Sequence, residues 1–157
     1  MKAYVMVGAP GSGKSTEAER IARTENATII SGDDIRRALY GSSEIKGNWV
    51  EIHDRIEELV SETCGMTIIL DGTHYLASYR REAITLLRSY GYDDITAVVM
   101  NPSLATCLAR NFQRTHHVPD YVIKSTHEKL QSSLHTLEIE GFNNVRYHEN
   151  KPLPVFI

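Results

Sequence analysis

Residues 8–16 read Gly8-Ala9-Pro10-Gly11-Ser12-Gly13-Lys14-Ser15-Thr16, between the apolar run Tyr4-Val5-Met6-Val7 and a polar segment at 17–23. This is the pattern G-x-x-x-x-G-K-[ST] in the strand–loop–helix setting of a phosphate-binding loop. Gly11 and Gly13 can adopt backbone angles that side chains forbid, so successive N–H groups can surround a phosphate. An ordinary glycine-rich turn would not require all of the fixed positions. The stretch therefore predicts a nucleotide site.

The residue types in this loop also predict what is bound. Lys14 supplies a full positive charge for the outer phosphates, and the Ser15 hydroxyl is a ligand for Mg²⁺. The helix that follows directs its partial positive charge at the same anion. ATP and Mg²⁺ are thus the expected cofactors. The phosphate-binding residues are Gly8, Ala9, Pro10, Gly11, Ser12, Gly13, Lys14, Ser15 and Thr16.

The composition limits the class of protein. With 157 residues, the chain is expected to form one domain, 1–157. No apolar run is long enough to span a bilayer, and residues 1–9 are too short and mixed for a signal peptide. Cys64 and Cys107 lack metal-ligand spacing, so both are interpreted as buried, reduced thiols of a cytoplasmic protein. Trp49 and most tyrosines are interpreted as packing residues.

Charge gives little sign of a nucleic-acid partner. The formal net charge is −3, so there is no global basic field. Residues 1–76 carry 8 basic and 12 acidic side chains, whereas residues 77–130 carry 7 basic and 5 acidic ones. A phosphate-rich substrate is therefore expected nearer the second segment, although the excess is small.

Strands and helices alternate along the chain. Apolar runs predict strands at about 3–7, 26–30, 66–70, 95–100 and 143–148. Helices are predicted at about 14–23, 33–39, 49–63, 77–90, 104–114 and 120–137, with a loop at 116–119 and an irregular tail around Pro152 and Pro154. This order predicts an α/β fold with a parallel sheet of about five strands, helices on both faces, and ligands at the carboxyl ends of the strands.

Two acidic clusters follow strands and should meet the phosphate loop. Asp33 and Asp34 open a helix, where one of them could serve only as a cap. A carboxylate there could instead accept the proton of an attacking hydroxyl. Arg36, one helical turn after Asp33, could clamp an acceptor phosphate, whereas Arg37 is expected to be solvated. Asp71 follows the third strand and is a candidate Mg²⁺ ligand.

Thr73 and His74 follow Asp71 and could face the acceptor or simply complete the loop. Arg110 and Arg114 have i, i+4 spacing and should share a helix face before the short loop at 116–119. They predict a helical lid, at roughly 110–127, whose guanidinium groups neutralise charge on a transferred phosphoryl group. The alternative is a solvated basic helix face.

In combination, these motifs resemble the kinase domain of phage polynucleotide 5′-kinase/3′-phosphatase. The resemblance covers residues 3–135 and rests on the phosphate loop, Asp33-Asp34-Ile35-Arg36, Asp71-x-Thr73, and Arg110-Asn111-x-x-Arg114 followed by Val118-Pro119. Residues 41–65 have no close match in that family and are expected to shape the acceptor side.

The resemblance implies a role for each matched residue. Lys14 and Ser15 would hold the ATP phosphates and Mg²⁺, with Asp71 as a further active-site carboxylate. Asp33 would be the general base, and Arg36 would bind the acceptor phosphate. Arg114 would stabilise the transferring phosphate, with Arg110 on the nucleotide.

Three functions remain open from the sequence. The first is ATP-dependent phosphoryl transfer to the 5′-hydroxyl of a nucleic-acid end. The second is a kinase for a small molecule such as a nucleoside, sugar or antibiotic, which the mild charge favours. The third is a nucleotide-dependent switch with no acceptor. Asp33-x-x-Arg36 argues against a switch, because a switch needs no acceptor base.

Overall fold

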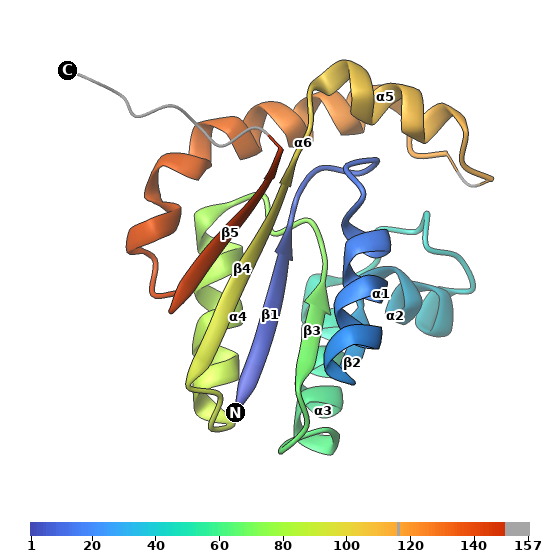
Figure 1. Ribbon diagram of the computed structural model, residues 1–157. Helices are drawn as coiled ribbons and strands as arrows, with labels where there is room; N and C mark the ends of the chain where they lie inside the picture. The colour runs from blue at the N-terminus through green and yellow to red at the C-terminus, as the bar shows by residue number, and fades with distance from the viewer. Residues whose placement is uncertain (116, 150–157) are drawn as a thin grey trace.

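A computed structural model of the chain describes residues 1–115 and 117–149, and it contains a five-stranded parallel sheet (Figure 1). The strands are β1 (Lys2–Val7), β2 (Thr28–Ser31), β3 (Ile68–Asp71), β4 (Asp94–Asn101) and β5 (Asn144–Glu149). The helices are α1 (Lys14–Glu25), α2 (Gly32–Tyr40), α3 (Trp49–Glu62), α4 (Ala77–Ser89), α5 (Leu104–Phe112), α6 (Asp120–Ser133) and the 3₁₀ segment η1 (Leu134–Ile139). The predicted fold class is confirmed.

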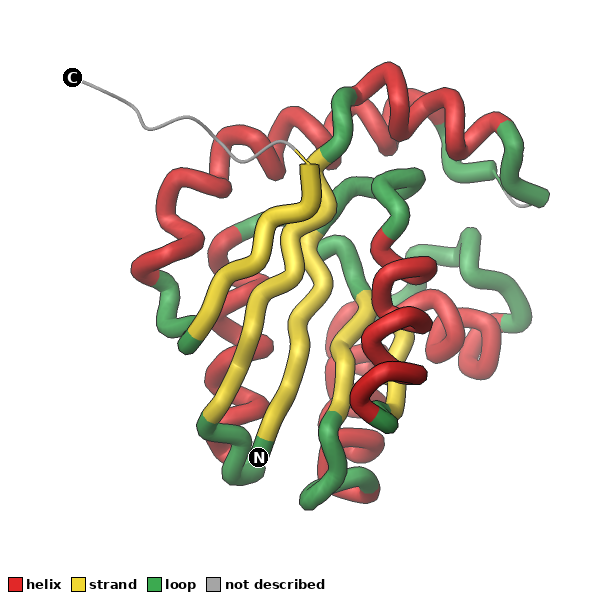
Figure 2. The backbone as a smooth tube through the Cα atoms, in the orientation of Figure 1, coloured by secondary structure: helices red, strands yellow, loops and turns green. Residues whose placement is uncertain are grey.

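The strand order β2-β3-β1-β4-β5 places β1 at the centre of the sheet. β1 pairs with β3 on one side and with β4 on the other, and all the pairings are parallel. The carboxyl ends of the strands therefore lie at one edge, where the loops that follow β1 and β3 come together (Figure 2). The sheet order reverses at β1, which is where open α/β sheets bind their ligands.

Helices cover both faces of the sheet, as predicted, but unequally. On one face, Ala18 and Ile21 of α1 pack against Tyr4, Met6 and other strand residues. The other face carries the larger core, formed with α3, α4 and η1. Figure 1 shows α1 in front of the sheet, with α3 and α4 behind it. None of the helices in the described ranges is both long and apolar enough to cross a membrane.

Several element boundaries differ from the predictions. Asn26 does not begin β2; it ends α1 in the left-handed conformation, at φ 53°. α5 stops at Phe112, and Gln113 caps it, so Arg114 lies beyond the helix. The predicted helix at 120–137 becomes 3₁₀ from Leu134. The expectations for His116 and for the tail from Pro152 fall outside the described residues.

The two cysteines differ in environment. Cys107 is buried as expected, between Ala9 and Ile123. Cys64 is exposed, so its predicted burial is wrong. Cys64 follows the C-terminal end of α3, past the last turn that packs on the sheet, and its thiol donates to the backbone carbonyl of Tyr90.

A buried ion pair joins the large core to the loop after β3. Arg80 and Glu140 are 0% and 2% exposed, and their two contacts are 2.6 and 2.7 Å long. The remaining guanidinium N–H groups donate to the His74 carbonyl, the Ser133 hydroxyl and the Ser133 carbonyl. Every Arg80 donor is therefore satisfied, as a buried charge requires.

The loop after β3 is held from both sides. His74 adopts φ 43°, and its Nδ1 lies 2.7 Å from the Met6 carbonyl. Because a carbonyl only accepts, Nδ1 carries the hydrogen. The Thr73 carbonyl accepts from the Gly8 amide at 3.0 Å. Both residues thus help to hold the loop, and both also line the cleft described below. Burial lowers the pKa of the His74 imidazole.

Replacing Arg80 with Met should lower the free energy of unfolding by about 3–5 kcal/mol, because Glu140 is left charged, buried and without its partner. The double variant Arg80→Met/Glu140→Leu should recover much of this loss. Urea unfolding would measure both. Arg55→Met is the matched control, since it breaks the exposed Arg55–Glu58 pair, and should cost less than about 1 kcal/mol. Equal losses for Arg80→Met and Arg55→Met would contradict the structural role of the buried pair.

The lowered pKa of His74 predicts a pH-dependent stability. The unfolded imidazole binds a proton below about pH 6.5, whereas the folded one resists it. The contribution of the neutral His74 imidazole to the free energy of unfolding is therefore complete above about pH 6.5 and is lost as the pH falls below this value. Urea unfolding at several pH values should show a weaker acid dependence for His74→Asn than for the wild type. His135→Asn, at an exposed site, is the control and should keep the wild-type dependence.

Candidate functional site

The phosphate loop is packed too closely for side chains at its glycines. Gly11 and Gly13 have φ values of 81° and 94°, as the motif predicts. A Cβ added at Gly11 would lie 2.4 Å from the carbonyl oxygen of Cys107 in α5. A Cβ at Gly8 would lie 2.7 Å from the Met100 carbonyl of β4. The loop is therefore fixed by contact with its neighbours as well as by its own turn.

Lys14 lies where several charges converge. Its ammonium group donates to the Ala9 carbonyl at 3.2 Å. Burial lowers the pKa of Lys14, while the carboxylates of Asp71 and Asp33 raise it and the Arg114 guanidinium lowers it further. The same loop holds the buried Ser12 hydroxyl, which has no hydrogen-bond partner within residues 1–115 and 117–149. A bound phosphate would offer oxygens that could accept from the Ser12 hydroxyl and pair with the Lys14 ammonium.

Ser15 and Asp71 lie side by side, although 56 residues separate them. The Ser15 hydroxyl donates to Asp71 Oδ2 at 2.9 Å, across the gap between the start of α1 and the end of β3. The parallel pairing of β1 with β3 creates this proximity. A hydroxyl and a carboxylate oxygen are hard ligands of the kind that Mg²⁺ prefers, so the two residues fit the predicted metal.

Asp33 is not the cap of α2. Ser31 is the cap, and its hydroxyl accepts from the Asp34 amide at 3.3 Å. Asp33 thus lies in the first turn, half-exposed, with Arg36 NH1 3.7 Å from its Oδ1. Asp34 lies outside the site and forms an ion pair with Arg37. Both side chains of this pair are exposed. The two carboxylates therefore have distinct environments.

Arg110 and Arg114 both line the site, but Arg110 lies within α5 and Arg114 lies in the turn that follows it. Arg110 is in the last turn of α5 and donates to the Ser12 carbonyl at 3.1 Å. Arg114 lies beyond the end of α5, so the predicted shared helix face is wrong. Its amide nevertheless donates to the Asn111 carbonyl, and this turn keeps Arg114 on the lining of the same cleft.

One cleft of about 550 Å³ contains these groups. It runs from the phosphate loop past Asp71 and Asp33 to an aromatic end, of which the sequence interpretation had only expected that residues 41–65 shape the acceptor side. That end is formed by Lys46, Gly47, Trp49, Tyr75 and Tyr79. Trp49 is 43% exposed, so it is not a buried packing residue. The only sequence signal for this end was the unmatched segment 41–65.

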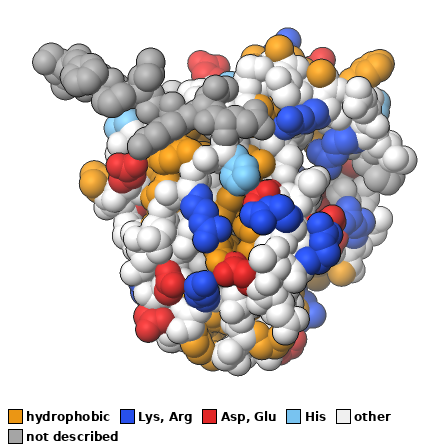
Figure 3. Space-filling view, in the orientation of Figure 1, with side chains coloured by type: hydrophobic (Ala, Val, Ile, Leu, Met, Phe, Trp, Pro, Cys, Tyr) orange, Lys and Arg blue, Asp and Glu red, His pale blue; other side chains and the backbone are white. Residues whose placement is uncertain are grey.

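Charges outside the cleft are mixed. In Figure 3, basic and acidic side chains are interspersed over the face that carries α1, and they form no continuous basic track there. This agrees with the net charge of −3. On this face, the structure offers no extended surface for a polyanion.

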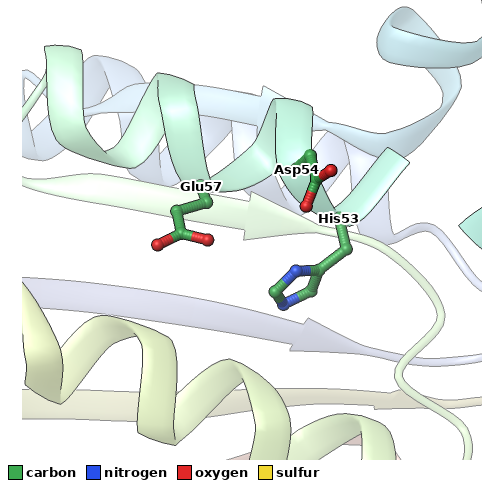
Figure 4. A group of neighbouring side chains, drawn as sticks. All are labelled: His53, Asp54 and Glu57. Carbon is green, nitrogen blue, oxygen red and sulfur yellow. The ribbon is translucent and has the colours of Figure 1, made fainter. Parts of the chain in front are cut away.

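A separate group of possible ligands lies on α3, where His53, Asp54 and Glu57 approach one another (Figure 4). His53 Nε2 is 3.1 Å from Glu82 Oε1 of α4, so the imidazole lies against the neighbouring helix. Asp54 and Glu57 are exposed. We interpret the group as a contact between α3 and α4 and assign no metal to it.

Comparison with known proteins gives one family and several relatives. A family model described as an AAA domain matches residues 4–137. The L-seryl-tRNA(Sec) kinase of Methanococcus maripaludis is 28% identical over 135 residues, which cover 82% of this chain and 52% of that protein. The adenylate kinase of Campylobacter curvus is 33% identical over 85 residues, 45% of each protein. The chain thus spans about half the length of these relatives.

Solved structures agree with this family. A chain of the Pnkp1/Rnl/Hen1 RNA repair complex has a TM-score of 0.73 at 26% identity, covering 84% of this chain and 44% of that one. A gluconokinase from Sinorhizobium meliloti has a TM-score of 0.63 at 22% identity, covering 93% and 81%, and shows the fold alone. From the match over residues 4–137, the chain belongs to the family described as an AAA domain, and it resembles P-loop kinase domains such as that of phage polynucleotide kinase.

Proposed function

We propose that the chain transfers the γ-phosphoryl group of ATP to the 5′-hydroxyl of a polynucleotide end. The observation that carries the proposal is Asp33 beside Arg36 in the cleft that the phosphate loop opens into. The Asp33 carboxylate would accept a proton and the Arg36 guanidinium would bind an anion, both across the cleft from the phosphates of ATP. The relatives that support a nucleic-acid acceptor are the L-seryl-tRNA(Sec) kinase and the chain of the RNA repair complex.

On the donor side, the loop amides and Lys14 would hold the β- and γ-phosphates. Ser15 and Asp71 would hold Mg²⁺, directly or through water, and the ion would neutralise charge on the phosphate oxygens. The 2.9 Å contact between these two side chains supports this assignment. Arg110, which already contacts the loop, would bind the nucleotide from the side of α5.

On the acceptor side, Asp33 would align the hydroxyl and accept its proton as the oxygen attacks the γ-phosphorus. Arg36 would bind the phosphate on the 3′ side of the reacting nucleoside through its guanidinium fork. The backbone carbonyl of Lys46 accepts from Arg36 Nε at 3.3 Å, which supports the orientation of this fork.

Arg114 would neutralise the charge that develops on the transferring phosphoryl group. Its exposure and its place beyond α5 support a residue that reaches the phosphates as the cleft closes. We further propose that residues 110–127 form this lid and that residues 1–157 act as one kinase domain.

A small-molecule kinase is the second candidate, and the mixed surface charge favours it. Labelled ATP should be offered with three groups of acceptors: 5′-hydroxyl RNA and DNA oligonucleotides, seryl-tRNA, and a panel of nucleosides, sugars and sugar acids. We expect label to appear on the 5′ ends of oligonucleotides. Transfer only to a small molecule would contradict the polynucleotide proposal. ATP hydrolysis that no acceptor increases would indicate a switch.

The variant Asp33→Asn should lower kcat for phosphoryl transfer by about 10²–10⁴-fold, because the amide cannot accept the proton. Binding of ATP, measured with a fluorescent nucleotide, should remain close to the wild type. Asp34→Asn is the matched control, since its carboxylate pairs with Arg37 outside the cleft, and should keep near-normal kcat. An unchanged kcat for Asp33→Asn would remove Asp33 from the mechanism.

A further inference from the structure

We infer that the aromatic end of the cleft, with Trp49 as its principal ring, binds the terminal base of the acceptor by stacking. This inference rests on the proposed function and names the part of the acceptor that this end recognises. Trp49, Tyr75 and Tyr79 come from the start of α3, the loop after β3 and the first turn of α4. They line the same cleft as Asp33 and Arg36.

The three rings form one continuous wall. The Trp49 and Tyr79 centroids are 5.7 Å apart with the rings tilted, and the Tyr79 and Tyr75 centroids are 5.5 Å apart in an edge-to-face arrangement. These are favourable geometries for aromatic pairs, so the rings support one another. Aromatic walls of this kind bind unpaired bases through their faces.

Core packing does not explain the position of Trp49. Ile52, one turn further along α3, is 1% exposed, and Val60 is fully buried, so α3 is anchored by other residues. Trp49 is 43% exposed, although it is the largest apolar side chain of the helix. An exposed ring of this size at the opening of a cleft is typical of a binding surface.

The chain before Trp49 nevertheless holds it in place. The side-chain oxygen of Asn48 caps α3 by accepting from the Val50 backbone amide at 2.8 Å. The backbone amide of Asn48 donates to the Tyr40 hydroxyl at 3.0 Å. Gly47 has φ 67°, and a Cβ there would lie 2.0 Å from the Tyr40 ring. The loop therefore packs flat on Tyr40 and fixes the start of α3. A ring that is both exposed and fixed loses little entropy when it binds a ligand.

The neighbouring groups indicate what kind of molecule uses this wall. Asp33 suits a hydroxyl, and the Arg36 guanidinium suits an anion. The wall adds a requirement for a flat ring. An open-chain sugar acid offers a hydroxyl and an anion but no ring, and a nucleoside lacks the anion. The end of a polynucleotide has a 5′-hydroxyl, a 3′-side phosphate and a base, which together match all three features.

Trp49 is the one tryptophan of the sequence, so its fluorescence reports on the wall directly. Titration with a 5′-hydroxyl oligonucleotide should quench this emission, because a stacked base lies against the indole. The same oligonucleotide with an abasic 5′-terminal residue should quench it much less. ATP alone should leave it nearly unchanged, since its phosphates belong at the other end of the cleft.

Kinetics of variants provide a second measurement. Trp49→Leu should raise KM for the oligonucleotide about tenfold or more, with kcat and KM for ATP nearly unchanged. Trp49→Phe should stay closer to the wild type because it keeps a ring. With the abasic oligonucleotide, Trp49→Leu should match the wild type. Val50→Ala is the control, because Val50 is adjacent, 65% exposed and outside the cleft lining, and should behave as the wild type.

The two measurements separate this inference from the proposed function. Equal quenching by the intact and abasic ends, or an equal rise in KM for both with Trp49→Leu, would overturn the stacking of the base. The absence of transfer to any 5′-hydroxyl end would overturn the proposed function. If the intact end quenches Trp49 emission more than the abasic end but no phosphoryl group is transferred, base stacking is supported and the proposed reaction is contradicted.

Discussion

The close packing at Gly11 is the constraint on which the rest of the site depends. The Cys107 carbonyl occupies the position that a side chain at residue 11 would need. Two hydrogen bonds hold the same loop from other sides, one from the Gly8 amide to Thr73 and one from Arg110 to Ser12. The phosphate loop, the loop after β3 and α5 therefore form one packed unit. Its shape exists only if all three segments are in place.

The two ends of the cleft are built by different means. The donor end consists mainly of backbone N–H groups and of Lys14, as suits a polyphosphate that is the same in every reaction of this kind. Side chains form the proposed acceptor end: Asp33 and Arg36 from α2, Trp49 from α3 and Tyr79 from α4. This division explains how P-loop kinases with similar folds can act on different molecules.

The Arg80–Glu140 pair connects the site to the core behind the sheet. Arg80 binds the carbonyl of His74, two residues after Gly72 and close to Asp71. It also binds Ser133 at the C-terminal end of α6, the helix whose first half belongs to the proposed lid at residues 110–127. A single buried guanidinium thus fixes the loop that carries a candidate metal ligand and the base of a segment expected to move. The loop after β3 and the proposed lid therefore have this side chain in common as an anchor.

The sequence by itself predicted the phosphate loop, because Gly11, Gly13, Lys14 and Ser15 form a recognisable pattern of backbone freedom and charge within one short stretch. Apolar runs likewise predicted the five strands and the fold. On the proposed acceptor side, the sequence predicted Asp33 and Arg36, and the tertiary structure alone added the aromatic side chains of Trp49, Tyr75 and Tyr79. Contacts between segments up to 60 residues apart decide three features of the structure. These are the exposure of Trp49, the place of Arg114 beyond α5 and the pairing of Arg80 with Glu140. The local sequence pattern carries no information on such contacts, because the burial of a side chain and its interaction partners depend on which segments pack together.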